Sequence, residues 1–480
     1  FSDMLYEHKD RAQNYKRVMP TKHGSNILMS EKLEINRRTF IQGAGATAIA
    51  SALGTSAPIA SAAESRESGE MIKYDFDKAY DRYGSNSVKW DQQVDIFGAG
   101  NIEVGMGIAD LDFETAPCIT EALEKRTAHK NWGYQKMPYD DYINGIVAWN
   151  KNRHGIDVAP DTIQLQEGVH HGLISTLRTV SPPKSKVLIM TPTYNGFYSD
   201  LKWSQTEASE SVMIFKNGNW SIDWDDFEAR MTPDTHALLL CNPQNPTGNV
   251  WSKKDLMRIG KLCLKHDVLV LADEIHCDFV RPGVIYTPFA SLPDKNIVDN
   301  SVTYKGLSKT FSLAAMKSSY YFCTDPTLAA RIKRNHRSSQ NSLGMIANEA
   351  AYRDGADWFD QLLPYLDSNH TLVENYLSEK LPSVGYTKAQ GTYFGWLDFG
   401  NLMNAIGAEK EAMTTQISDA PKTPTQILEK WLVTNAKVQL NPGSSYGKGS
   451  ETFMRMNLGT SKANITHALD NIAQAIAKIS

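Results

Sequence analysis

The chain of 480 residues contains only five cysteines, and none of them form a CxxC pair. An odd number of cysteines without such pairs argues against a disulfide framework and against a structural zinc site. The twelve histidines show no HxxxH spacing either. One alternative is a metal held by His276, Cys277 and Asp278, but this group lacks a fourth ligand at any motif spacing. The sequence therefore predicts no metal site.

The chain also lacks a strong excess of charge of one sign. Its 50 Lys and Arg residues nearly balance 54 Asp and Glu residues, which gives a formal net charge of -4. A nucleic-acid-binding domain usually carries a basic surface, so this class is disfavoured. From residue 71 onward the chain shows no internal repeat and no long low-complexity run. With 41% hydrophobic residues, the composition is that of a globular protein large enough for two domains.

The N-terminal region contains no continuous apolar run that is long enough to be a good membrane-spanning helix. Residues 36–63 place Arg37 and Arg38 before a weakly apolar stretch rich in Ala and Gly, which ends in the small residues 60–62. This stretch resembles a twin-arginine export signal, and the alternatives are a disordered tail or an uncleaved membrane anchor. We therefore predict a periplasmic or otherwise exported protein, with a cytoplasmic location as the alternative. Residues 1–65 form an extension and signal region outside the folded part, and Met29 is a natural start for the signal.

Seven short apolar runs, rich in β-branched or aromatic residues, follow in the rest of the chain. They begin near residues 162, 186, 211, 236, 268, 301 and 318. Helix-like segments separate several of them, and Ser252 is a plausible N-cap for one at 252–266. This alternation predicts an α/β fold with a parallel sheet covered by helices. The pattern changes after about residue 340, so we predict a large domain at 110–345 and a smaller α+β domain made of 71–109 and 346–480.

Several of the predicted strands end in loops that suit a ligand, because ligands bind at the carboxyl edge of such sheets. Gly168 follows the strand at 162 and is expected to allow a tight turn into a helix, where the amides of Val169 and His170 suit a phosphate. Tyr194 follows the next strand and could lay its ring on a flat cofactor. Asn245 lies in the loop CNPQNPTG, where two prolines stiffen the backbone.

Two further loops carry charged groups. Asp273, with His276 close behind it, ends the apolar run VLVLA. A carboxylate at the end of a buried strand is costly unless it meets a cation, such as a protonated pyridine nitrogen. Lys309 follows the strand at 301 and suits a Schiff base, and Ser308 and Lys317 could hold a phosphate. Lys305 lies within the strand and is the worse candidate.

Together, the motifs NPQNPTG, ADEIH and SKT, with a lysine eight positions after the last lysine, resemble the fold-type I pyridoxal-phosphate enzymes of the class I/II aminotransferase superfamily. The resemblance runs from about residue 75 to the end. The stretches DRYGSNSVKWD, IADLDF, WGYQKMP, DEIHCDF and NPGSSYG point to one branch, the cystathionine β-lyase and cystalysin-like carbon–sulfur lyases. The resemblance implies an aspartate aminotransferase-like large domain with a mainly parallel seven-stranded sheet.

The resemblance also implies a role for each motif residue. Lys309 forms the Schiff base and moves the Cα proton, and Asp273 pairs with the pyridine nitrogen. Asn245 contacts the ring oxygen and Tyr194 stacks on the ring, while the phosphate is held by Gly168, Val169, Ser308 and Lys317. Tyr134 reaches the phosphate of the neighbouring subunit, Arg455 clamps the substrate carboxylate, and Asn245 and Tyr134 also contact the substrate. A homodimer is therefore implied. His276 is also expected at the cofactor, where typical aminotransferases carry a tyrosine that bonds the ring oxygen, and this difference favours the lyase branch. Ala315 replaces a glycine common in this segment.

The expected activity is α,β-elimination from L-cystathionine or another L-cysteine S-conjugate, which yields pyruvate, ammonia and a thiol. The alternative is an aminotransferase that acts on an amino acid and a 2-oxo acid, because both reactions use the same residues. A more remote alternative is a regulatory protein that binds pyridoxal phosphate without catalysis. Regulators of this kind carry a basic winged-helix segment before the fold, whereas this chain has the arginine pair at 37–38.

Overall fold

The computed structural model describes residues 72–78, 80–136, 139–416 and 421–479. The predicted export signal at 36–63 lies outside the described residues. Among the helices of the described part, none combines the length and the apolar character that crossing a membrane requires.

The larger sheet has seven strands in the order β2-β10-β9-β8-β7-β3-β4. All neighbouring pairs are parallel except those made by β10, which runs antiparallel to β2 and β9. The strands are β2 (Ile163–Gln166), β3 (Lys186–Thr191), β4 (Glu207–Val212), β7 (Thr235–Cys241), β8 (Leu269–Asp273), β9 (Ser301–Lys305) and β10 (Ser319–Phe322). This sheet confirms the predicted α/β class with a mainly parallel sheet.

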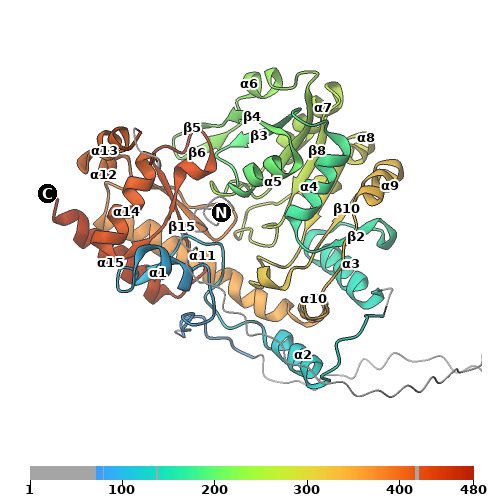
Figure 1. Ribbon diagram of the computed structural model, residues 1–480, viewed down its shortest axis with the longest axis horizontal. Coiled ribbons are helices and arrows are strands. Elements are labelled where there is room, and N and C mark those ends of the chain that lie inside the picture. Colours follow the sequence, from blue (N-terminus) through green and yellow to red (C-terminus); the bar gives the residue numbers. More distant parts are fainter. Residues whose placement is uncertain (1–71, 79, 137–138, 417–420, 480) are drawn as a thin grey trace, which may run out of the picture. The chain divides into compact units, whose positions relative to one another are not determined.

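Helices cover both faces of this sheet (Figure 1). Successive side chains of a strand point to opposite faces, and here both faces are buried. Val187 and Ile189 of β3 pack with α4, α5 and α9, whereas Leu188 and Met190 pack with α6, α7 and α8. The helices of the described part up to α9 are α1 (Asp91–Phe97), α2 (Pro117–Ala128), α3 (Asp140–His154), α4 (Val169–Val180), α5 (Gly196–Ser204), α6 (Trp224–Ala229), α7 (Lys253–Lys265), α8 (Lys295–Asp299) and α9 (Pro326–Asn335). Burial on both faces explains why the strands read as continuous apolar runs.

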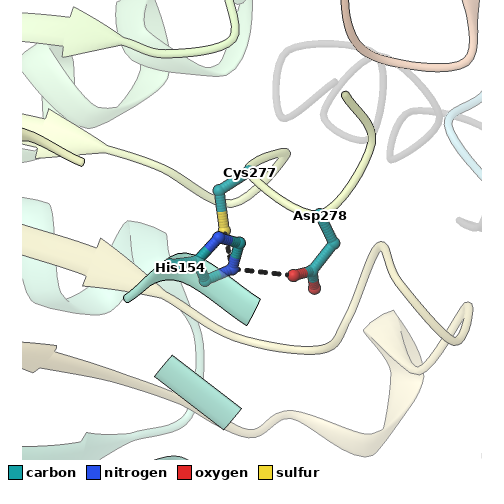
Figure 2. A group of neighbouring side chains, drawn as sticks. All are labelled: His154, Cys277 and Asp278. Carbon is teal, nitrogen blue, oxygen red and sulfur yellow. Dashed lines mark hydrogen bonds and ion pairs between the residues drawn. The ribbon is translucent and has the colours of Figure 1, made fainter. Parts of the chain in front are cut away.

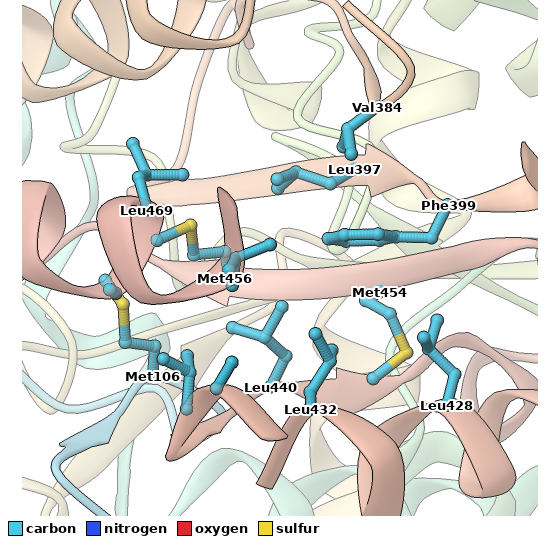
Figure 3. Close-up of a cluster of buried hydrophobic side chains, with 14 of the residues drawn as sticks. Met106, Val384, Leu397, Phe399, Leu428, Leu432, Leu440, Met454, Met456 and Leu469 are labelled. Carbon is cyan, nitrogen blue, oxygen red and sulfur yellow. The ribbon is translucent and has the colours of Figure 1, made fainter. Parts of the chain in front are cut away.

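The second sheet is antiparallel and lies in the C-terminal part of the chain. Its order is β11-β12-β15-β14. The strands are β11 (Gly385–Tyr386), β12 (Phe394–Asp398), β14 (Asn441–Pro442) and β15 (Phe453–Asn457), and the helices that follow α9 are α10 (Ser342–Asp354), α11 (Ala356–Lys380), α12 (Gly400–Ala405), α13 (Ala408–Thr415), α14 (Pro424–Ala436) and α15 (Lys462–Ala477). Leu397, Met454 and Met456 of this sheet share one buried cluster with Leu432 of α14 and Leu469 of α15 (Figure 3).

Smaller elements lie outside these two sheets. Strand β1 (Val104–Gly105) pairs in parallel with β13 (Val438–Gln439), and Met106 joins the same buried cluster (Figure 3). Strands β5 (Ile214–Lys216) and β6 (Asn219–Ser221) form a hairpin, and short 3-10 helices occupy Pro160–Thr162, Phe289–Ser291, Ala314–Met316 and Gly443–Tyr446. The predicted domain limits, 110–345 against 71–109 with 346–480, stay a prediction.

Candidate active site

A cavity of about 270 Å³ opens at the carboxyl edge of the larger sheet. The loops that follow β2, β3, β7, β8 and β9 all contribute to it, because the carboxyl ends of strands that run in one direction meet at one edge. The predicted residues that line this cavity are Gly168, Val169, Tyr194, Asn245, Asp273, His276, Ser308, Lys309 and Lys317. The structure thus brings together residues that lie up to 149 positions apart in the chain.

One end of the cavity suits a phosphate. Val169 begins α4, a helix of 12 residues, so its first amides lie at the positive end of the helix dipole. Ser308 and Lys317 line the same cavity. The expected tight turn at Gly168 is wrong, because its φ of 172° and ψ of 156° are extended backbone that any residue adopts.

Lys309 lies in the loop after β9, and its Nζ donates a hydrogen bond to the carbonyl oxygen of Ala109 at 3.2 Å. Burial lowers the pKa of Lys309, and the charges of Arg455 and Lys317 lower it further, against the opposing charges of Asp110 and Asp273. A lysine with a lowered pKa is a better nucleophile and base at neutral pH. Lys305 points elsewhere: its Nζ donates to Asn150 Oδ1 at 2.8 Å.

Asp273 is the last residue of β8 and is only 3% exposed. Burial raises the pKa of Asp273 to about 6, although a hydrogen bond from the Ile275 amide and the charge of His170 act in the opposite direction. The amide of Ile275 donates to Asp273 Oδ1 at 3.1 Å. A cation placed against the carboxylate would lower this pKa again, so Asp273 suits a partner that carries a proton on nitrogen.

Arg455 connects the second sheet to Asn245, a residue that lines the cavity. It lies on β15, is 3% exposed, and donates to Asn245 Oδ1 at 3.1 Å and to the Gly107 carbonyl at 2.7 Å. Its guanidinium carbon lies 4.2 Å from the centre of the Phe394 ring. Among the described residues, no hydrogen-bond partner is found for the buried Nε of Arg455. A buried guanidinium with an unused donor suits a carboxylate ligand.

His276 is 2% exposed and packs edge-to-face against Tyr393 and Phe394. Burial holds the pKa of His276 well below its ordinary value, and the charges of Lys309 and Arg455 act in the same direction. The imidazole is therefore neutral at physiological pH. Its Nδ1 is buried and has no hydrogen-bond partner within the described part of the chain.

Sequence reasoning missed a chain of contacts at the rim of the cavity. His170, which also lines the cavity, lies 3.2 Å from the Tyr194 hydroxyl through Nε2 and 2.7 Å from Asp200 Oδ1 through Nδ1. Asp200 belongs to α5, and no motif spacing connects it to His170. The only signal in the sequence was the His170-His171 pair directly after Val169.

A second buried polar group consists of His154, Cys277 and Asp278 (Figure 2). His154 Nε2 lies 2.9 Å from Asp278 Oδ1 and 3.5 Å from Cys277 Sγ. Asp278 Oδ1 also accepts from Trp149 Nε1 at 3.1 Å, and Oδ2 accepts from the Thr310 hydroxyl at 2.6 Å. The histidine that lies beside Cys277 and Asp278 is therefore His154, and not His276 as in the metal alternative considered from the sequence. Because donors occupy both carboxylate oxygens, we interpret the group as a hydrogen-bonded anchor for the loop of Lys309.

Tyr134 lies outside the Lys309 cavity. It is fully exposed and lines a separate cavity of about 550 Å³. Lys125, Arg126, His129 and Arg353 line that cavity as well. The predicted role of Tyr134 concerns a neighbouring subunit, and it stays a prediction.

The sheet order, the helices on both faces and the lysine and aspartate at the carboxyl edge define an α/β protein with the aspartate aminotransferase-like fold. The profile of the family "Aminotransferase class I and II" matches residues 101–472, and the chain belongs to this family.

Individual relatives are similar over nearly their whole length. Cystathionine beta-lyase PatB of Bacillus subtilis (strain 168) is 36% identical over 407 residues, which cover 84% of this chain and 100% of PatB. Protein MalY of Escherichia coli (strain K12) is 30% identical over 412 residues, which cover 85% of this chain and 100% of MalY. The crystal structure of cystalysin from Treponema denticola, which contains pyridoxal 5'-phosphate, superposes with a TM-score of 0.77 at 27% identity and covers 85% of this chain and 100% of cystalysin.

The donor set of the cavity fits pyridoxal phosphate. The helix start at Val169 and the side chains of Ser308 and Lys317 match its phosphate, and the carboxylate of Asp273 matches its ring nitrogen. Lys309 provides the amine that an aldehyde needs. Each of these groups lines the same 270 Å³ cavity.

Proposed function

We propose that this protein is a pyridoxal-phosphate-dependent carbon–sulfur β-lyase that cleaves L-cystathionine or another L-cysteine S-conjugate. The observation that carries the proposal is the 36% identity to a cystathionine beta-lyase over that protein's full length. The cavity supports it, because the lysine and the aspartate that such a reaction requires line it, and the arginine contacts Asn245 in its wall. An aminotransferase is the second candidate, favoured by the family to which the chain belongs.

Three residues of the chain, Arg455, Asp273 and Lys309, have separate roles in the proposed reaction. Bound pyridoxal phosphate supplies an aldehyde for amines and a pyridinium ring that accepts the electrons released at Cα. Arg455 binds the α-carboxylate of the substrate, and Asp273 holds the proton on the ring nitrogen. The neutral Nζ of Lys309 would remove the Cα proton of the substrate. The C–S bond at Cβ then breaks, a thiol leaves, and hydrolysis of the remainder gives pyruvate and ammonia.

The burial of the site explains why these groups work at neutral pH. The same low exposure that lowers the pKa of Lys309 raises that of Asp273, so Lys309 is available as a base and Asp273 seeks a cation. His276 remains neutral beside them and adds no competing positive charge.

A pyruvate assay decides between the two candidate reactions. The purified protein is incubated with L-cystathionine and pyridoxal phosphate, without any 2-oxo acid, and pyruvate and thiol are followed together. Equal amounts of both products support the lyase, whereas strict dependence on an added 2-oxo acid assigns an aminotransferase. The Lys309→Ala variant is the control, and it should form no borohydride-fixed adduct with the cofactor.

The assembly proposed here is a homodimer in which Tyr134 reaches the site of the other subunit. The full exposure of Tyr134, away from its own Lys309 cavity, supports this role. Complementation tests it: Lys309→Ala and Tyr134→Phe homodimers are mixed under conditions that exchange subunits. Recovery of activity in the mixture supports a shared site, and a mixture as inactive as its components contradicts it.

The location proposed here is the periplasm or another exported compartment, reached through the twin-arginine pathway. Arg37 and Arg38, the weakly apolar stretch behind them and the small residues at 60–62 support this location. Fractionation of cells that express a C-terminally tagged chain from Met29 tests it. The Arg37→Lys, Arg38→Lys double variant should remain in the cytoplasm. Equal cytoplasmic retention of the unaltered chain contradicts export.

A further inference from the structure

Three side chains from three elements form a hydrogen-bonded chain at the rim of the Lys309 cavity. His170 lies in the first turn of α4, Tyr194 follows β3, and Asp200 belongs to α5. His170 Nδ1 lies 2.7 and 2.9 Å from the two oxygens of Asp200, and Nε2 lies 3.2 Å from the Tyr194 hydroxyl. The centres of the His170 and Tyr194 rings lie 5.6 Å apart, and the angle between the ring planes is 36°.

Gly196 lies directly against both rings of this chain. A Cβ atom on Gly196 would lie 2.5 Å from Tyr194 Cε1 and 2.7 Å from His170 Cε1, distances that real contacts do not reach. Glycine at this position therefore allows the rings to approach the start of α5. The contact with His170 therefore accompanies close packing of the Tyr194 ring against Gly196.

The environment of His170 favours its protonated form. Burial lowers the pKa of His170, but the hydrogen bond to Asp200 and the charges of Asp200 and Asp273 outweigh burial, so that the pKa is raised. Asp200 is only 1% exposed, and a buried carboxylate needs such a cation. Burial raises the pKa of Tyr194, so its phenol stays neutral and its oxygen can accept a hydrogen bond from Nε2 of His170. Tyr194, Asp200, Asp273 and Lys309 are the titratable groups that face His170, and His171 faces Asp200.

We propose that His170 is a positioning residue of the cofactor site: its imidazolium holds the Tyr194 ring in place for stacking and keeps the carboxylate of Asp273 ionised opposite the ring nitrogen. The proposal rests on the proposed function, because it requires pyridoxal phosphate as the ligand. His170 contacts Tyr194, and it lines the same cavity as Asp273, on which its charge acts. A neutral side chain at 170 removes that charge, and Asp273 then takes up its proton at a higher pH.

The experiment measures the dissociation constant of pyridoxal phosphate between about pH 5 and about pH 9, a range that covers histidine titration. The variants are His170→Gln and Asp200→Asn, and the second keeps the imidazole but removes the carboxylate that protonates it. His266→Gln is the matched control, because His266 also pairs with a carboxylate, Glu228, at 3.1 Å, and precedes β8 rather than following it.

We expect both variants to move the acid-side loss of binding up by roughly one pH unit, and His170→Gln to weaken binding about tenfold at neutral pH as well. The control should bind as the unaltered protein does. A loss of affinity by the same factor at every pH, or an Asp200→Asn variant with an unaltered pH profile, overturns the positioning role. Asp200→Asn decides alone if His170→Gln does not fold. Failure of the unaltered protein to bind pyridoxal phosphate rejects the proposed function instead.

Discussion

Arg455 Nη1 donates a hydrogen bond to Asn245 Oδ1 at 3.1 Å, and this contact joins the antiparallel sheet to the loop after β7. The two residues lie 210 positions apart, yet both are almost fully buried. The contact places the guanidinium at the edge of the Lys309 cavity, where a substrate carboxylate can meet it. The proposed binding of a substrate carboxylate by Arg455 therefore depends on how the two sheets pack.

The first prediction concerns the shape of the cation at position 455. Arg455→Lys keeps the positive charge but loses the planar fork that can bind a carboxylate with two hydrogen bonds. We expect the KM for L-cystathionine to rise by at least about thirtyfold, since truncating a buried charged pair costs about 2 kcal/mol or more. Steady-state kinetics measure this change. An unaltered KM contradicts the role of Arg455, and the cofactor dissociation constant, which should stay the same, is the control.

The second prediction concerns the stability of the cofactor-free protein. The pKa of Asp273 is about 6 in the folded chain against an ordinary 3.8, so the folded state binds more protons than the unfolded state between these values. Stability from this group is therefore complete below about pH 3.8 and falls as the pH rises through about 6. The difference between the two pKa values corresponds to about 3 kcal/mol in the free energy of unfolding.

Asp273→Asn removes this titration. We expect the cofactor-free variant to be more stable than the unaltered protein at pH 7, by up to about 3 kcal/mol, and to lose the advantage near pH 4. Thermal unfolding of both proteins across this range provides the measurement. The same variant should lose activity, because the ring nitrogen loses its carboxylate. A constant stability difference at every pH contradicts the raised pKa.

Much of this site was predictable because each motif residue follows an apolar run. Asp273 directly ends β8, and Lys309 follows β9 by four residues, so the parallel sheet alone brings them to one edge. His154 and Asp200 could not be found in this way. They come from α3 and α5, helices whose orientation relative to the strands is set by packing of apolar side chains, and sequence spacing does not encode that orientation.

The same reason explains why the sequence suggested the wrong third member for the metal alternative. His276 is adjacent to Cys277, but it turns towards Tyr393 and Phe394, whereas His154 at the end of α3 reaches Cys277 and Asp278. Sequence neighbours point in different directions within an irregular loop.

The third prediction concerns Asp278 as an anchor for the loop of Lys309. The Thr310 hydroxyl donates to buried Asp278 at 2.6 Å, and Thr310→Val removes this bond while preserving the shape of the side chain. We expect the free energy of unfolding to fall by about 1.5–3 kcal/mol, the range for hydrogen bonds to charged groups. Thr324→Val is the matched control, because Thr324 donates to Asp299 at 2.8 Å on the surface, and it should change stability by less than about 0.5 kcal/mol. Equal unfolding temperatures for the two variants contradict an anchoring role.

The fourth prediction uses the close packing at Gly196, the first residue of α5. Alanine within a helix is usually more stabilising than glycine by about 0.5–1 kcal/mol. At position 196, however, the added Cβ would lie 2.5 Å from the Tyr194 ring, so the ring must move. We expect Gly196→Ala to destabilise the protein by about 1–3 kcal/mol and to weaken cofactor binding through the displaced ring.

Gly400→Ala provides the comparison for Gly196→Ala, because Gly400 is likewise the first residue of a helix, α12. An added Cβ there would approach Asp398 Oδ1 at 3.2 Å and make ordinary contacts with Thr452 at 3.5 and 3.6 Å. The carboxylate of Asp398 can shift by a few tenths of an ångström, so Gly400→Ala should leave cofactor binding unaltered. Unfolding curves and cofactor titrations of both variants separate the two effects. If Gly196→Ala binds the cofactor as tightly as Gly400→Ala, the orientation of the Tyr194 ring does not control binding.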